Sequence, residues 1–186
     1  MRRLVYTFLV LIFAAAACSP AVTTKRKRKN KKKPRTLHAN TNVPKPYKKR
    51  KSQCQLYEPL IRETAKKYKL EPELVMGVVK VESGFNPGVK SRVGARGLMQ
   101  VMPKTGKYMK CGSDLHDPEE NIECGCKVLR KYTDRYKGNL VYGLSAYNAG
   151  PGNTNPSNRL SELPFNFRYV EKVLRWRNVF VRFGCR

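Results

Sequence analysis

A long basic stretch without a single acid limits where this chain can build a core. Residues 18–53 contain fourteen Lys and Arg and no Asp or Glu, and prolines at positions 34, 44 and 46 interrupt the basic runs. We expect this stretch to be a disordered linker, because it has few apolar side chains to offset the entropy cost of ordering and because its like charges repel. A compact domain is therefore expected only in residues 54–186, a length that suits one domain.

The N-terminus predicts a secretory signal peptide in residues 1–17. Arg2 and Arg3 precede an apolar run, and small residues follow up to Ala17, which is the order found in such signals. The apolar run is shorter than the roughly 20 residues of a typical membrane span, and a retained membrane anchor is the alternative.

The small residues before Cys18 resemble the lipobox of bacterial lipoproteins. This resemblance implies that Cys18 is acylated after cleavage, which would anchor a soluble domain to a membrane. We therefore expect an exported, periplasmic protein anchored in the outer membrane. Simple secretion with an ordinary thiol at Cys18 is the alternative.

The net charge follows this division of the chain. The formal charge of +26 divides into +2 for residues 1–17, +14 for residues 18–53 and +10 for residues 54–186. Because most of the excess lies on the linker of an exported chain, we expect no nucleic-acid partner, and a nucleic-acid-binding tail is the alternative. The linker either contacts anionic lipid or cell-wall surfaces or serves only as a solvated spacer.

Residues 54–186 show the periodicity of helices, and we expect an all-α fold. No stretch alternates apolar and polar residues for long, and proline stands in the first turn of three expected helices. The helices are expected at about 58–68, 72–83, 118–136, 140–148 and 167–180, the last with Val170, Val173, Leu174 and Trp176 available for burial. The long glycine-bearing stretch 83–102 follows the second helix, and such stretches in compact domains are usually functional.

Four short blocks carry the chemistry. Residues 82–87 are Glu-Ser-Gly-Phe-Asn-Pro, Ser91 is followed by Gly-Ala-Arg-Gly-Leu-Met-Gln at 94–100, residues 146–150 are Ala-Tyr-Asn-Ala-Gly, and Tyr169-Val170 comes last. Together with Asn121-Ile122, these blocks closely resemble the soluble lytic transglycosylases (SLT domain), a goose-lysozyme-like family that cleaves peptidoglycan. The resemblance covers about residues 55–181 and implies a lysozyme-like helical fold with a substrate cleft.

Glu82 is the candidate catalytic residue. It ends the second expected helix on the side that carries Val75, Val78 and Val79, and glycines follow it. A carboxyl group held between an apolar helix face and a glycine-rich loop is partly desolvated, which raises its pKa toward the range of about 6–7 that suits a general acid. The resemblance implies the same role, in which Glu82 protonates the leaving glycosidic oxygen and then acts as a base.

The motif blocks contain one carboxylate, whereas most glycosidases use two. Asp114 and Asp117 are the nearest other acids, and Asp117 is better explained as a helix cap. The substrate can supply the missing groups, because N-acetylmuramic acid has a 2-acetamido carbonyl that can stabilise the cationic centre and a 6-hydroxyl that can attack it.

The resemblance therefore implies cleavage of the β-1,4 bond between N-acetylmuramic acid and N-acetylglucosamine with formation of a 1,6-anhydromuramic end, and it implies no cofactor. A hydrolysing muramidase on the same fold is one alternative. The other is a non-catalytic wall-binding component of a secretion or conjugation apparatus, which would make trans-envelope machinery a partner.

The remaining motif residues are expected to contact the glycan. Asn and Gln amides suit hydroxyl and acetamide groups, Tyr offers a flat apolar face with a polar tip, and Gly lets backbone approach a ligand. Structural roles are the alternatives for Met99 and Tyr147 in the core and for Ser83 and Asn148 at helix ends. By resemblance, the substrate-binding residues are Ser83, Ser91, Gly97, Met99, Gln100, Tyr147, Asn148, Ala149 and Tyr169.

One block departs from the family pattern. The family often has Glu-Thr-Arg shortly before the Tyr-Val pair, whereas this chain has Phe165-Asn166-Phe167 and then Arg168. The polar contacts of that Glu and Thr therefore cannot be carried over to this chain.

The cysteines fit an oxidising compartment. With Cys18 acylated, five remain, and we expect two disulfides and one thiol. Cys54 and Cys185 bracket the domain and can join its ends, whereas Cys111 can pair with Cys124 or with Cys126. Positions 124 and 126 point to different sides of a helix, so they are not expected to pair with each other. The spacing does not favour zinc, and no metal site is expected.

Overall fold

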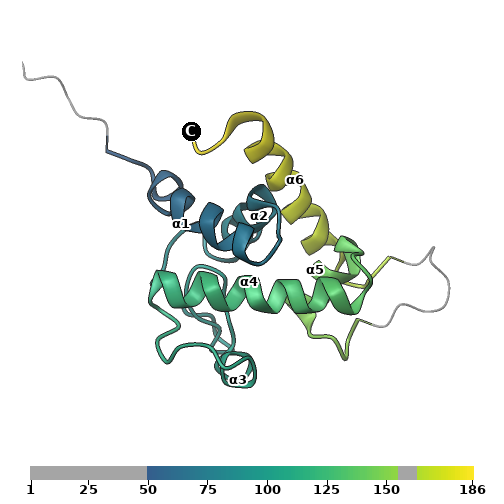
Figure 1. The fold of residues 1–186 in the computed structure, drawn as a ribbon. Helices are drawn as coiled ribbons and strands as arrows, with labels where there is room; N and C mark the ends of the chain where they lie inside the picture. The colour runs from purple at the N-terminus through teal and green to yellow at the C-terminus, as the bar shows by residue number, and fades with distance from the viewer. Residues whose placement is uncertain (1–49, 155–162) are drawn as a thin grey trace, which may run out of the picture. The chain divides into compact units, whose positions relative to one another are not determined.

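The computed structural model describes residues 50–154 and 163–186 of the chain. The predicted signal peptide, Cys18 and the basic linker up to residue 49 lie outside these described residues. Within them the fold is all-α, as predicted, and its helices are α1 (Gln53–Lys67), α2 (Pro72–Glu82), α3 (Pro103–Tyr108), α4 (Pro118–Arg135), α5 (Leu140–Ala149) and α6 (Phe167–Phe183) (Figure 1). No helix in the described ranges is long and apolar enough to cross a membrane.

The helix α2 lies at the centre of the core. Its residues 74–79 are buried, and it packs against both α1 and α6. The helix α4 contacts α1 and α5, and α5 contacts α6 (Figure 1). Buried apolar side chains of these helices form one core. The two helices α2 and α6 pack closely at Gly77, where an added Cβ would lie 2.7 Å from the carbonyl oxygen of Val173 on α6. This close packing fixes the end of α2, which carries Glu82, against α6.

The first helix begins earlier than predicted. Ser52 and Gln55 form a capping box, in which each side chain accepts a hydrogen bond from the backbone N–H of the other residue. The helix α1 therefore starts at Gln53, and Pro59 lies inside it. Proline suggested a helix start at residue 58 because it is most often tolerated in the first turn. Here α1 instead accepts the loss of one backbone hydrogen bond at Pro59 in its interior.

The stretch after α2 ends in a helix that the sequence did not predict. Antiparallel bridges join Lys90 to Arg96 and Arg96 to Val101, and α3 follows at Pro103. This helix has six residues, of which only Gly106 is buried. An apolar pattern cannot be detected over so short a segment.

The later helices follow the predictions within a few residues. Side chains of Asp117 and Asn139 cap α4 and α5 by accepting backbone hydrogen bonds in the first turn. The helix α6 runs to Phe183, beyond the predicted end at residue 180. Trp176, which was expected to be available for burial, keeps 36% of its surface exposed because Val170, Val173 and Phe180 fill the core side of α6 instead.

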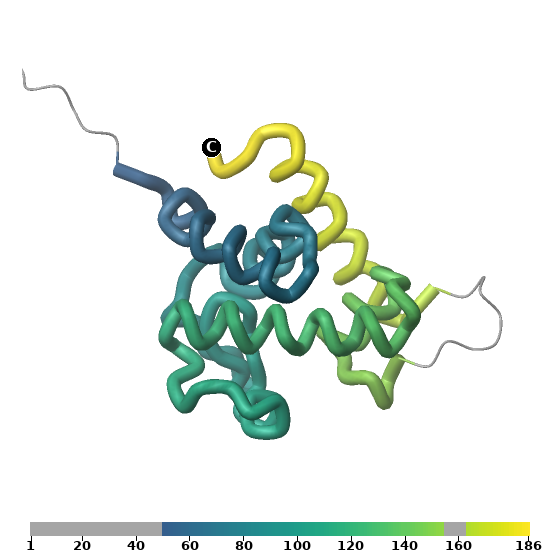
Figure 2. Tube along the Cα trace, in the orientation of Figure 1, coloured from purple at the N-terminus to yellow at the C-terminus, as the bar shows by residue number. Residues whose placement is uncertain are grey.

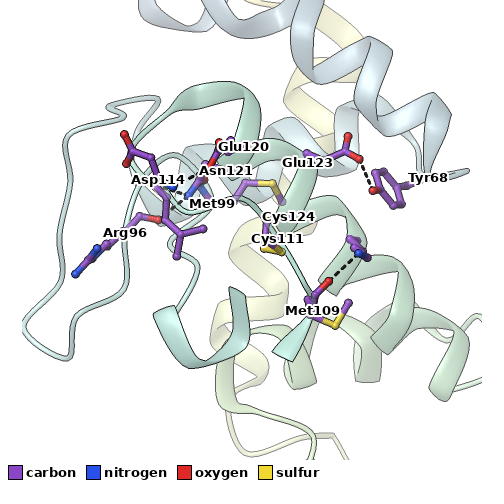
Figure 3. Close-up of a disulfide and its surroundings, with 12 residues drawn as sticks. Tyr68, Arg96, Met99, Met109, Cys111, Asp114, Glu120, Asn121, Glu123 and Cys124 are labelled. Carbon is purple, nitrogen blue, oxygen red and sulfur yellow. Dashed lines mark hydrogen bonds between the residues drawn. A yellow bond between two sulfur atoms is a disulfide. The ribbon is translucent and has the colours of Figure 1, made fainter. Parts of the chain in front are cut away.

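Two disulfides hold the described domain. Cys54–Cys185 joins the first turn of α1 to the chain after α6, as predicted, and Figure 2 shows the C-terminal segment curving back toward the start of α1. Of the two partners left open for Cys111, the structure has Cys124, which ties the chain after α3 to α4 (Figure 3). Cys126 is a buried free thiol.

Candidate active site

A pocket of about 430 Å³ opens at the C-terminal end of α2. Its walls come from the loop after α2 and from α3, α4 and α5. Glu82, the last residue of α2, is the one acidic side chain among the described residues that line it. The lining consists of Glu82, Ser91, Val93, Ala95, Gln100, Val101, Met102, Thr105, Val128, Tyr132, Ala146, Tyr147, Asn148, Ala149 and Gly150.

The carboxyl group of Glu82 changes its protonation state near neutral pH. Burial raises its pKa to about 7, and a hydrogen bond from the Tyr169 hydroxyl to Oε1, 2.7 Å long, lowers the pKa and so opposes part of that rise. Burial and the nearby charge of Glu82 raise the pKa of Tyr169 well above its usual value, so this hydroxyl stays protonated and remains a donor. The predicted desolvation of Glu82 therefore has a structural basis.

The other predicted acids lie away from the pocket. Asp117 accepts a hydrogen bond from the Glu120 backbone and caps α4, as predicted. Asp114 accepts from the His116 backbone at 2.8 Å and does not line the pocket. Among the described lining residues, one carboxyl group, that of Glu82, can therefore donate or accept a proton in a reaction at this site.

Asn121 on α4 and Tyr147 on α5 both form hydrogen bonds to the backbone of the loop before α3. The backbone N–H of Met99 donates to Asn121 Oδ1, and the Tyr147 hydroxyl donates to the Met99 carbonyl, each at 2.7 Å. The Asn121 amide nitrogen also donates to the carbonyls of Arg96 and Leu115 at 2.8 and 2.7 Å (Figure 3). Asn121 is fully buried, so these bonds are shielded from water.

Two predicted contact residues lie behind the pocket because they pack against α4. Met99 is fully buried, and its side chain fills the space beside Gly125, where an added Cβ would collide with it. Gly97 has φ +76°, and an added Cβ would collide with Leu115 and Asn121. The absence of a side chain at Gly97 thus permits close packing against Leu115 and Asn121.

Ser83 also lies outside the pocket lining. Its hydroxyl donates to the carbonyls of Val79 and Leu98, at 3.2 and 2.7 Å. The residue therefore ties the end of α2 to the following loop, which is the structural alternative raised for it.

Ser91 and Gln100 line the pocket as predicted. The Gln100 amide nitrogen donates to the carbonyls of Val89 and Gly97 at 3.0 and 2.9 Å, and Ser91 Oγ accepts from the Ala95 backbone at 3.0 Å. Both side chains are therefore held in place by the backbone of their own loop.

The block that departs from the family pattern supplies polar contacts through Asn166. Its side-chain nitrogen Nδ2 donates to Asn148 Oδ1 at 2.9 Å, and its side-chain oxygen Oδ1 accepts from the Ser145 hydroxyl at 2.6 Å. Asn148 and Ala149 line the pocket as predicted, and Asn166 fixes the first of them from outside α5. Nothing in the sequence signalled this role, because one Asn between two Phe residues has no pattern of its own.

Apolar residues that no motif predicted complete the pocket. Val93 and Met102 are 76% and 37% exposed, and Val128 and Tyr132 approach from α4. These residues belong to different segments, and only the packing of those segments brings them to one surface.

Residues 59–162 match the family described as "Transglycosylase SLT domain". The chain belongs to this family. The similarity that the motif blocks indicated is thus confirmed, and the lysozyme-like helical fold is confirmed by solved SLT structures. The crystal structure of the 70 kDa soluble lytic transglycosylase SLT70 from Escherichia coli has a TM-score of 0.63 and 30% identity, covering 68% of this chain and 24% of that one.

Curated relatives of this SLT domain are similar over about half of the chain. A transglycosylase of Enterobacteria phage PRD1 is 46% identical over 88 residues, which are 47% of this chain and 32% of the relative. Membrane-bound lytic murein transglycosylase C of Actinobacillus pleuropneumoniae serotype 5b is 38% identical over an alignment of 113 residues that covers 52% of this chain and 31% of that protein. The chain therefore spans about a third of the length of these relatives.

Proposed function

We propose that this SLT-domain protein is a peptidoglycan lytic transglycosylase that cleaves the β-1,4 bond between N-acetylmuramic acid and N-acetylglucosamine. The observation that carries the proposal is the single carboxyl group of Glu82, which is desolvated in a pocket and has a pKa of about 7. Family membership and relatives named lytic murein transglycosylases support the same reaction.

In the proposed reaction Glu82 acts first as an acid and then as a base. The protonated carboxyl gives its proton to the glycosidic oxygen while the bond from C1 of N-acetylmuramic acid to that oxygen breaks. The 2-acetamido carbonyl stabilises the cationic centre, and the 6-hydroxyl oxygen forms a new bond to C1. The Glu82 carboxylate takes the hydroxyl proton, so the acid is restored and a 1,6-anhydromuramic end forms without water.

The pKa and the hydrogen bond of Glu82 suit both steps. A group with a pKa near the working pH is present in both protonation states, which favours transfer in either direction. The Tyr169 hydroxyl stabilises the carboxylate that exists between the two steps, because it donates to Oε1.

We assign glycan contact to the predicted residues that reach the site. The pocket-lining members are polar or small and lie on the loop before α3 and on α5, while Tyr169 reaches Glu82 from α6. We propose that Ser83, Gly97 and Met99 position these groups from behind. The proposed contact residues are Ser91, Gln100, Tyr147, Asn148, Ala149 and Tyr169.

Mass spectrometry of muropeptides tests this function. Purified peptidoglycan is digested with the full chain, with Glu82→Gln, and with Glu171→Gln, an exposed carboxylate on α6 that serves as the matched control. We expect 1,6-anhydro ends from the wild type and the control, and a loss of about a hundredfold or more with Glu82→Gln.

The alternative functions give different products. Reducing ends would identify a hydrolysing muramidase, and wild-type binding without cleavage would identify a wall-binding component. Unchanged cleavage by Glu82→Gln would remove Glu82 from the mechanism.

We also propose that the protein is exported and anchored in the outer membrane through acylated Cys18. The N-terminal sequence supports this, as does the similarity to a relative named membrane-bound. Metabolic labelling with a fatty acid should mark the wild type and not Cys18→Ser, and the variant should leave the membrane fraction. Equal labelling and fractionation of both would exclude the anchor.

A further inference from the structure

A second pocket, of about 520 Å³, lies at the end of α6. Its surface is mainly apolar and aromatic. Phe85 and Phe180 are buried in its wall with ring centroids 5.9 Å apart, whereas Trp176 and Phe183 keep 36% and 51% of their surfaces exposed. The lining residues are Ser52, Gln53, Cys54, Lys80, Gly84, Phe85, Trp176, Val179, Phe180, Phe183, Gly184, Cys185 and Arg186.

Three aromatic residues of α6 recur at intervals of seven. They are Tyr169, Trp176 and Phe183. Seven residues make nearly two helical turns and rise about 10.5 Å, so the three side chains follow one side of α6. The first donates to Glu82, and the other two line the second pocket. One side of α6 therefore leads from the proposed catalytic carboxyl to this pocket.

The end of α2 and the residues after it line both the candidate active site and the second pocket. Glu82 lines the candidate active site, whereas Lys80, Gly84 and Phe85 line the second pocket. The six residues 80–85 thus contribute to both pockets, which are close neighbours along the chain.

The rim of the second pocket is cationic. Lys80 Nζ lies 4.9 Å from the centroid of the Trp176 ring, and the Arg186 guanidinium lies 5.3 Å from the centroid of the Phe183 ring. The described lining residues include no Asp or Glu. Aromatic faces suit the apolar faces of sugar rings, and adjacent cations suit carboxylates.

We propose that the second pocket is an accessory binding site for peptidoglycan, occupied by an anionic part of the glycan outside the active site. Its cations would pair with carboxylates of the lactyl group or peptide stem while its exposed rings contact the sugars. The nature of the polymer rests on the proposed function. The concave form of the site favours a polymer segment over a membrane surface, because aromatic residues that enter a bilayer must protrude.

Binding to intact cell-wall sacculi tests the site without any cleavage. All proteins carry Glu82→Gln, and the amount that co-sediments with purified sacculi is measured over a range of concentrations. We expect Trp176→Ala and Phe183→Ala each to weaken binding by about fivefold to tenfold. Val181→Ala is the matched control, because Val181 is 57% exposed on the same turn and does not line the pocket. Its binding should equal that of the parent.

A rate comparison separates this proposal from the proposed function. In the otherwise wild-type chain, the ratio of the cleavage rate on sacculi to that on a short soluble muropeptide oligomer should fall by about fivefold in both pocket variants. A wild type that cleaves neither substrate would refute the proposed function and leave the sedimentation result standing. A pocket variant in which both rates fall together would refute an accessory site.

Three further results would overturn the proposal. The first is sedimentation of both pocket variants equal to that of the parent at unchanged melting temperature. The second is stronger retention of the parent on vesicles of anionic phospholipid than on sacculi, with loss of that retention in Phe183→Ala. The third is a dimer of the parent in light scattering that becomes monomeric in Trp176→Ala.

Discussion

Replacing Glu82 with Gln should stabilise the protein at neutral pH while abolishing its proposed activity. Burial raises the pKa of this carboxyl from the usual 4.5 to about 7 in the folded state. The folded protein therefore favours the protonated acid, and the stability from that preference is fully present below pH 4.5 and is lost as the pH rises to about 7. A shift of about 2.5 units at about 1.4 kcal/mol per unit gives a cost of about 3 kcal/mol above pH 7.

Gln cannot ionise, so Glu82→Gln avoids this cost. The free energy of unfolding of both proteins is measured by urea unfolding at several pH values between 4.5 and 8, with the disulfides intact and with circular dichroism as the signal. The variant should gain stability over the wild type as the pH rises, by about 3 kcal/mol in total, and the gain should level off above pH 7. The matched control Glu171→Gln removes an exposed charge and should shift stability by less than about 0.5 kcal/mol throughout.

The pH dependence of the difference in unfolding free energy tests whether the Glu82 carboxyl is desolvated. A difference between Glu82→Gln and the wild type that is the same at pH 5 and pH 8 would mean that the carboxyl is not desolvated, and the physical basis of the proposed acid would fail. A wild type that gains stability over the variant as the pH rises would mean that the charged form is favoured in the fold.

Other predictions follow from single contacts. Tyr169→Phe removes the bond that lowers the pKa of Glu82, so the alkaline limb of the pH profile of kcat/KM should move to higher pH, and an unmoved limb would contradict the role of this bond. Asn121→Ala leaves three backbone groups, two of them in buried hydrogen bonds, without their partner and should cost about 3 kcal/mol in urea unfolding, whereas a loss under about 1 kcal/mol would show that water replaces the amide. The double variant Cys54→Ser/Cys185→Ser should lose about 4–5 kcal/mol by the same assay, because its disulfide closes a loop of 131 residues, and no loss would show that the unfolded chain is not constrained by it.

The helices were predictable where local signals agreed with packing. The pairs Glu71-Pro72 and Asp117-Pro118 mark helix starts correctly, because proline is tolerated in the first turn. Pro59 misled for the opposite reason, since the Ser52 capping box upstream and the packing of α1 outweigh the hydrogen bond that proline removes. The six residues of α3 gave no periodic signal at all.

The site was predictable in its chemistry and less so in its geometry. The desolvation of Glu82 could be predicted from its position on an apolar helix face, and the structure confirms that burial raises the pKa of its carboxyl group. Ser83 and Met99 belong to the same motif blocks, but only packing reveals that their side chains lie behind the pocket. Asn166 could not be found, because its role depends on the distance between its loop and α5.

The bond between Cys54 and Cys185 also determines how the domain responds to force. A pull on the chain ahead of Gln53 would reach the first turn of α1, and there the disulfide transfers the tension to the end of α6. The helices α1 and α6 then share the load, because Cys54 remains part of α1 while its sulfur is bonded to Cys185, and α6 is held by its packed contact with α2. Under reducing conditions the same pull would peel α1 from the core, so the mechanical strength of this domain depends on the redox state of its surroundings.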